Sequence, residues 1–128
     1  MLFRHFTFSI LWALLILMLS LVPGSELPEM SFWELLTFDK VMHIFMYGVF
    51  AFKTMMAASK QNSIWWMRRW AGVFTIAVVS LFGVSIEIMQ ETLLPDRYGD
   101  WVDVLANTIG VFSGLYIFRA VFYDCIRR

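Results

Sequence analysis

The chain has 128 residues, of which 60% are hydrophobic and 16% are charged, and its ten basic residues balance its ten acidic ones. Its aromatic and methionine content exceeds what a soluble core of this size could bury, so the composition predicts one membrane domain over residues 1–128. The low charge excludes a disordered chain, and the zero net charge argues against a nucleic-acid-binding surface. The single cysteine, Cys125, excludes an intramolecular disulfide.

The first apolar run carries no charge from residue 6 to residue 25 and follows Arg4 and His5. About 20 residues at roughly 1.5 Å per residue are enough to cross the hydrocarbon core of a bilayer, so the run predicts a first membrane helix over residues 6–23. A cleaved signal peptide has the same order of basic and apolar residues, but residues 22–24 fit a cleavage site poorly. The uncleaved helix is therefore favoured.

Three further apolar runs predict helices over residues 38–58, 70–91 and 101–123. Lys40 and Lys53 bound the uncharged part of the first of these, and their stems can lie along the apolar layer while the ammonium groups reach the headgroups. The fold expected is therefore all-α, an integral membrane bundle of four transmembrane helices.

The connection between the first two predicted helices contains its own helix-start signal. Ser31 is followed three residues later by Glu34, which is the spacing of a capping box, and Trp33 between them suits headgroup depth. We therefore expect a short interfacial helix in this connection.

The charges are distributed unequally between the connections. Three alternate stretches hold eight basic residues and one acid: Arg4, Lys53, Lys60, Arg68, Arg69, Arg119, Arg127 and Arg128, with Asp124. The other connections hold nine acids with only Lys40 and Arg97. Because basic residues in short loops are retained on the cytoplasmic side, both termini are expected to be cytoplasmic, in the inner membrane.

Polar residues at helical spacing occur at the outer ends of the second, third and fourth predicted helices, where ionisable groups are costly unless paired or hydrated. They are Asp39, His43 and Tyr47 with Lys40 beside them; Glu87, Gln90 and Glu91; and Asp100, Asp103 and Asn107. If these stripes face inward, they meet in one polar pocket that opens outward.

Each of these residues also has a purely structural interpretation. Asp39 is a natural partner for His43 four residues later, and Arg97 is the obvious cation for Glu87. His43 with Glu87, Asp100 or Asp103 could form a one-histidine metal site, but no zinc-type spacing such as H-E-x-x-H is present, and neither a metal nor another cofactor is expected.

General acid and base catalysis is the enzyme chemistry that these residue types could support. Glu87 or Asp103 would be the base, and His43 would be the acid or would orient the base. Neither Ser80 nor Ser85 has a histidine neighbour in the sequence, so no nucleophile with an obvious base is evident.

The motifs resemble those of the VanZ-like family of small bacterial membrane proteins. The resemblance is carried by residues 39–48, 87–91, 97–103 and 107–110 with Gly114, in matching order and spacing. The founding member of that family is associated with resistance to the antibiotic teicoplanin. The resemblance implies functional roles for Asp39, Lys40, His43, Tyr47, Glu87, Gln90, Arg97, Asp100, Asp103, Asn107 and Gly110.

Three functions are compatible with these observations. The leading hypothesis is a pocket that binds an envelope lipid, a lipid-linked cell-wall intermediate or an amphipathic antibiotic, with Lys40 and Arg97 meeting a phosphate or carboxylate group. The second is a membrane-embedded acid–base enzyme that modifies such a lipid. The third is a polar cluster that only stabilises the bundle.

Overall fold

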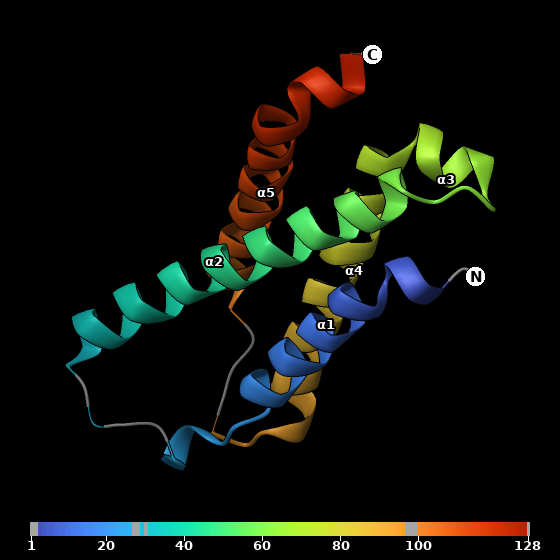
Figure 1. The fold of residues 1–128 in the computed structure, drawn as a ribbon. Coiled ribbons are helices and arrows are strands. Elements are labelled where there is room, and N and C mark those ends of the chain that lie inside the picture. Colours follow the sequence, from blue (N-terminus) through green and yellow to red (C-terminus); the bar gives the residue numbers. More distant parts are fainter. Residues whose placement is uncertain (1–2, 27–28, 30, 97–99, 128) are drawn as a thin grey trace.

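The structure is a computed structural model that describes residues 3–26, 29, 31–96 and 100–127. Within these residues the chain is helical and contains no strand, which confirms the all-α prediction. The helices are α1 (Thr7–Ser20), α2 (Phe32–Ser59), α3 (Trp65–Arg69), α4 (Ala71–Leu93) and α5 (Trp101–Arg127), with short 3₁₀ helices at Phe3–His5 and Gly24–Glu26. Figure 1 shows their arrangement.

Helix α2 begins with the capping box that the sequence indicates. The Ser31 hydroxyl accepts a hydrogen bond from the Glu34 backbone N–H at 3.3 Å, and the Ser31 backbone N–H donates to the Glu34 carboxylate at 3.2 Å. The helix then continues without interruption to Ser59. The prediction of a separate short interfacial helix was therefore wrong, because no proline or helix-ending glycine divides the capped turns from the apolar run that follows.

Three helices are long and apolar enough to cross a membrane, over Thr37–Ser59, Ala71–Leu93 and Trp101–Phe122. Helix α1 is apolar but has 14 residues. At about 1.5 Å per residue it is roughly 21 Å long, which is less than the ~30 Å of a typical hydrocarbon core. The described part of the chain thus contains three long spans and one shorter apolar helix.

Helices α2 and α5 cross at a contact between glycines. A Cβ atom on Gly110 would lie 2.6 Å from the Ile44 carbonyl oxygen and 3.1 Å from the Gly48 backbone nitrogen, and one on Gly114 would overlap the Gly48 carbonyl oxygen. Small residues at such positions let two membrane helices approach until their backbones touch. This crossing fixes the first half of α5 against the middle of α2.

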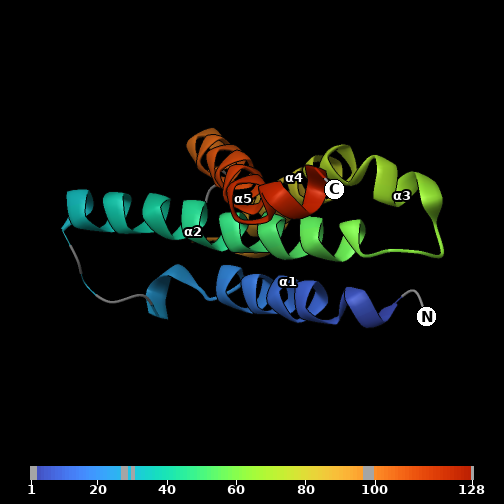
Figure 2. The same cartoon turned by 45° about the horizontal axis from the view of Figure 1, so that its top comes forward.

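Helix α1 lies alongside α2 and away from α5 (Figure 2). The Trp12 indole N–H donates to the Met46 carbonyl oxygen at 2.9 Å, and the Lys53 ammonium group lies 5.5 Å from the centre of the Phe8 ring. A cation over an aromatic ring is attracted by the negative face of the ring quadrupole. These contacts fasten the first half of α1 to α2.

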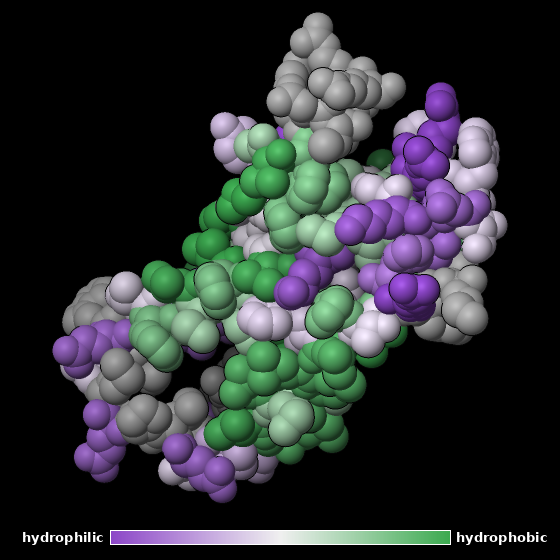
Figure 3. Space-filling view, in the orientation of Figure 1, coloured by the Kyte–Doolittle hydropathy of each residue, from purple (hydrophilic) through white to green (hydrophobic). Residues whose placement is uncertain are grey.

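The outer surface of the bundle is apolar between two polar ends. Figure 3 shows hydrophobic residues over the middle of one face and hydrophilic residues at its two extremes. The exposed apolar side chains include Phe45, Leu81, Ile109 and Phe112, which come from α2, α4 and α5. Large apolar surfaces on several helices are what a lipid environment selects.

Candidate functional site

Three helices bring buried polar side chains together at one end of the bundle. The first half of α2, the last turns of α4 and the first turns of α5 contribute them. Glu87, Gln90, Asp103 and Asn107 are each less than 9% exposed. Buried polar groups at this density need partners, and the contacts below show how far this need is met.

Lys40 links α2 to the start of α5. Its ammonium group donates hydrogen bonds to Asp103 Oδ1 and, at 3.0 Å, to Asp100 Oδ2, and Asp39 Oδ2 lies 3.6 Å away. One cation therefore serves three carboxylates. This arrangement explains how a lysine and an aspartate can lie side by side near the end of an apolar span.

Asp100 also caps helix α5. Its Oδ1 accepts a hydrogen bond from the Val102 backbone N–H at 2.9 Å. This bond, followed by the contact with the Lys40 ammonium group, lowers the pKa of Asp100 below its usual value. Asp100 thus stays ionised, orders the first turn of α5 and holds Lys40.

His43 lies between an amide and two carboxylates. Its Nδ1 is 2.8 Å from Asn107 Oδ1, and because an amide oxygen only accepts, Nδ1 carries a proton that it donates. Its Nε2 lies 3.7 Å from Asp39 Oδ1 and 4.0 Å from Asp103 Oδ2. The ring is therefore oriented with Nε2 towards the acidic side of the site.

Three buried polar atoms beside His43 have no hydrogen-bond partner among the described residues: Tyr47 Oη, Glu87 Oε1 and Asn107 Nδ2. The Tyr47 ring stacks on His43 with centroids 6.2 Å apart and an interplanar angle of 11°. The other Glu87 oxygen accepts from the Asp100 backbone N–H at 3.3 Å. An unmade hydrogen bond on a buried group costs about 1–3 kcal/mol, so these three atoms need partners beyond those that the described residues supply.

Gly83 makes room for this arrangement. A Cβ atom there would lie 3.0 Å from Tyr47 Cε1 and 3.2 Å from Asn107 Nδ2. The missing side chain lets the tyrosine of α2 and the asparagine of α5 both pack against α4, one turn before Glu87. Gly83 is a site residue that the sequence analysis missed, and the sequence signal for it was its position four residues before Glu87.

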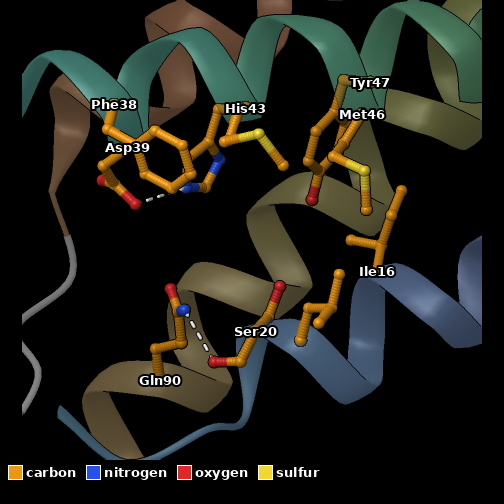
Figure 4. Close-up of a pocket in the computed structure, with 10 residues that line it drawn as sticks. Ile16, Ser20, Phe38, Asp39, His43, Met46, Tyr47 and Gln90 are labelled. Carbon is orange, nitrogen blue, oxygen red and sulfur yellow. Dashed lines mark hydrogen bonds and ion pairs between the residues drawn. The ribbon is translucent and has the colours of Figure 1, made fainter. Parts of the chain in front are cut away.

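A partly open cavity of about 210 Å³ lies next to this cluster (Figure 4). Helix α1 forms one wall, and the Gln90 side-chain amide of α4 donates to the Ser20 carbonyl oxygen at 2.8 Å, joining the end of α1 to α4. The Tyr47 hydroxyl points from α2 into the space between these helices. The lining residues are Ile16, Leu19, Ser20, Phe38, Asp39, Met42, His43, Met46, Tyr47 and Gln90.

The structure brings most of the sequence-based candidates into one neighbourhood. Bonded contacts connect Asp39, Lys40, His43, Asp100, Asp103 and Asn107, and Tyr47 and Glu87 adjoin them through His43 and Asp100. Gln90 lies on the other side of the cavity, and Glu91 is exposed. Arg97, which the sequence suggested as the partner of Glu87, lies outside the described residues.

The apolar wall of the cavity was not foreseen either. It comes from α1, whose sequence is apolar on every side and so gives no indication of which face meets α2. Met42 and Met46 lie within residues 39–48, but their apolar side chains were not singled out as candidates.

Fold and site together define a class of protein. It is an all-helical protein with several membrane-spanning segments and a histidine–carboxylate cluster between its helices. The VanZ/LLP1 family model matches residues 2–123, and the chain belongs to that family. This membership and the three long apolar helices support a multi-pass membrane protein of the VanZ type. Neither the curated proteins nor the solved structures contain a match to the chain.

Proposed function

We propose that this protein binds an amphipathic molecule of the cell envelope, either a membrane lipid or a lipid-linked cell-wall intermediate, in the cavity between α1, α2 and α4. The observation that carries the proposal is the meeting of an apolar wall with the Asp39–His43 pair in one partly open cavity of about 210 Å³. Ligand sites are typically concave and mostly apolar, with a few polar groups that fix orientation. The apolar chain would lie against Ile16, Leu19 and Met42, and the head group against Asp39 and His43.

The charge of the site restricts the head group. Three carboxylates, Asp39, Asp100 and Asp103, lie within 3.6 Å of the Lys40 ammonium group, which is the one cation of the site among the described residues. A fourth, Glu87, is bonded to the Asp100 backbone N–H. A bare phosphate would have to compete with these aspartates for Lys40. Head groups that donate hydrogen bonds, such as the hydroxyls of a glycan or an amine, fit the described residues better.

The proposal includes a topology of four spans with both termini in the cytoplasm of the inner membrane. Figure 1 places the described N-terminal residues, α3 and the end of α5 towards one end, and the connections after α1 and α4 towards the other. Most of the basic residues belong to the first of these ends and most of the acidic ones to the second, where Lys40 also lies. A short helix such as α1 can cross where the bilayer thins locally, and the site would then open to the outer leaflet.

The test is to fill the cavity without changing its charge. Met42 lines the cavity, whereas Phe112 is exposed on the outer face of α5. We expect Met42→Trp to lose the lipid that copurifies with the wild type, measured by native mass spectrometry, and Phe112→Trp to retain it. Equal lipid occupancy in the two variants, both folded by circular dichroism, would contradict the proposal.

A second candidate function, acid–base catalysis on the bound molecule, is favoured by the orientation of His43. Asn107 fixes the proton on Nδ1, and Nε2 faces the carboxylates of Asp39 and Asp103. A histidine oriented by a neighbouring acceptor is the usual arrangement for proton transfer. We expect Glu87→Gln, which leaves the cavity lining unchanged, to keep lipid binding but to lose a change in the lipid and cell-wall precursor profile that the wild type produces in a deletion strain. His43→Ala should lose the same change. An unaltered profile on deletion rejects this function.

The same substitutions separate both functions from a purely structural role. Removing one partner of a buried ion pair costs about 3–5 kcal/mol when the pair only holds the fold together. A cluster without a ligand would therefore show a large loss of thermal stability in detergent, with the same copurifying lipid in Met42→Trp as in the wild type and no change in the lipid profile on deletion.

A further inference from the structure

We propose that Asp39, His43 and Asp103 bind a divalent transition-metal ion at the polar end of the cavity. One side-chain atom from each of these three residues lies within 4.8 Å of the others. Two residues come from α2 and one from α5, and the glycine contact between these helices holds them at a fixed spacing. This inference goes beyond amphiphile binding and does not depend on it.

The distances suit a single ion after a small contraction. His43 Nε2 lies 3.7 Å from Asp39 Oδ1 and 4.0 Å from Asp103 Oδ2. Nitrogen and oxygen ligands stand about 2.0–2.2 Å from a tetrahedral zinc ion, and so roughly 3.4 Å from one another. All three ligand atoms lie within 4.8 Å of one another, so rotation of the two carboxylate side chains would have to bring them closer together around the ion.

The partners outside the three ligands also match a metal site. A metal-binding histidine almost always donates its other ring N–H to an oxygen acceptor, and His43 Nδ1 donates to Asn107 Oδ1 at 2.8 Å. Lys40 binds Asp103 through Oδ1, which leaves Oδ2 turned towards His43. His43 of α2 and Asp103 of α5 are therefore oriented before any ion arrives.

A second observation, separate from the three ligands, points to an additional occupant. The Tyr47 hydroxyl is buried, has no partner among the described residues and points into the cavity beside His43 (Figure 4). Three protein ligands leave coordination positions open for water, and a buried hydroxyl nearby gives such a water a partner.

The ligand types select the kind of ion. One imidazole and two carboxylates suit Zn²⁺ or Mn²⁺, whereas the soft ions prefer thiolates, and the chain has a single cysteine far along at position 125. A divalent ion would also offset the excess of carboxylates around Lys40. A phosphate-bearing head group could then meet the ion instead of the occupied lysine.

The experiment measures zinc binding to the full chain, stripped with a chelator and purified in detergent. Zinc is titrated in competition with a chromogenic chelator, and bound metal is counted by mass spectrometry. We expect one zinc per chain, and an affinity at least tenfold weaker in Asp39→Asn and Asp103→Asn. Glu91→Gln is the matched control, because Glu91 is an exposed acid near the same end of α4. It should bind like the wild type.

Two further variants keep the test decisive if an aspartate variant fails to fold. Asn107→Ala leaves all three ligands in place and should weaken zinc binding about 10–100-fold through the lost orientation of His43. Lys40→Gln removes a nearby positive charge and should bind zinc at least as tightly as the wild type. Equal affinity in the wild type and in folded Asp39→Asn, Asp103→Asn and Asn107→Ala overturns the proposal.

The outcome is independent of the amphiphile test. Met42→Trp leaves the three ligands intact, so it should still bind zinc while it loses lipid. If zinc binds but lipid occupancy does not differ between the wild type and Met42→Trp, the amphiphile proposal fails and the metal proposal stands. If lipid still binds after chelation and no zinc binds, the metal proposal fails and the amphiphile proposal stands.

Discussion

Buried polar atoms without partners distinguish this site from an ordinary polar contact between helices. Lys40, Asp100 and Asp103 satisfy one another, and His43 is satisfied at Nδ1 by Asn107. Next to them, the Tyr47 hydroxyl has no partner among the described residues. Under the proposed function, a molecule bound in the cavity would supply the partner of this hydroxyl.

Tyr47→Phe tests this explanation directly. The substitution removes the unpaired hydroxyl and keeps the ring that stacks on His43. We expect the stability in detergent to stay unchanged or to rise by up to about 1 kcal/mol, because a buried group without a partner is removed. The amount of copurifying lipid should fall at the same time. A loss of stability by more than ~1 kcal/mol in thermal unfolding would mean that the hydroxyl is bonded within the protein.

Gly83 provides a second prediction about a single residue. A Cβ atom at this position would press on the Tyr47 ring at 3.0 Å and on Asn107 at 3.2 Å, whereas one at Gly72 would meet nothing within 4 Å. Both glycines lie in α4, so the general gain from alanine in a helix, up to about 1 kcal/mol, is available to both. We expect Gly72→Ala to be neutral or stabilising. Gly83→Ala should lose about 1–3 kcal/mol through overpacking, measured by thermal unfolding.

At the scale of elements, helix α5 begins at the site, and Asp100 belongs both to the start of α5 and to the site. The same carboxylate caps the helix through Val102 and holds Lys40 of α2. The first half of α2 is thus connected to α5 by the ion pair of Lys40 with Asp100. The middle of α2 is connected to α5 by the glycine contact. Two different kinds of contact set the angle between these helices.

Acid should weaken the connection through Asp100. The folded-state pKa of Asp100 is lowered by the Val102 N–H and by Lys40, so its contribution to stability is present above the pKa of the unfolded chain and is lost as the pH falls through the folded value. Asn caps helices as well as Asp does, so Asp100→Asn keeps the cap and removes the ion pair. We expect the wild type to exceed Asp100→Asn in melting temperature at neutral pH. This difference should disappear on acidification, and a constant difference would contradict the assignment.

The sequence predicted where helices lie along the chain better than it predicted which side chains meet between helices. Apolar runs at 70–91 and 101–123 correspond closely to Ala71–Leu93 and Trp101–Arg127, because a span needs a long uncharged run that is easy to recognise. The capping box at Ser31 is also visible in the sequence, but the sequence predicts its helix as separate from the span, whose uncharged part begins after Lys40. Partners on α5 let Lys40 lie inside one continuous helix.

The candidate site was predicted in part for a similar reason. A spacing of four residues places Asp39, His43 and Tyr47 on one face of α2 whatever the fold. Such polar stripes could therefore be predicted from the sequence alone. Which helix each stripe meets depends on packing. Neither the wall formed by α1 nor the room made by Gly83 has a local signature, and both became apparent only with the helices in place.

At the scale of the whole molecule, charge and shape agree on two distinct ends. The described N-terminal residues, α3 and the end of α5 lie towards one end, and the acidic site lies towards the other (Figure 1). Arg68 and Arg69 in α3 lie beside exposed tryptophans, which is the composition of a membrane–water interface on the basic side. The proposed topology puts this end in the cytoplasm and the site at the outer leaflet.

Single cysteines, introduced after Cys125→Ser, can test this topology with a thiol reagent that does not cross membranes. Asn62 lies in the connection between α2 and α3, Glu26 follows α1, and Asp96 follows α4; all three are exposed. In cells that have lost their outer layers but keep a sealed inner membrane, we expect labelling at positions 26 and 96. Position 62 should be labelled only after the inner membrane is permeabilised. The reverse pattern would invert the orientation and place the cavity on the cytoplasmic side.

Labelling of a cysteine at position 5 tests whether the short helix α1 crosses the membrane. His5 is exposed and lies just before α1, and Glu26 lies beyond the other end of α1. If α1 spans the bilayer, cysteines at positions 5 and 26 react from opposite sides, whereas a helix that only lies against α2 leaves both on one side. We expect opposite sides, because the charge of Arg4 favours retention in the cytoplasm and the contacts of Trp12 and Lys53 hold α1 along α2. Labelling of both positions from outside would reduce the count to three spans. The α1 wall of the cavity would then have to lie along the outer leaflet rather than across the bilayer.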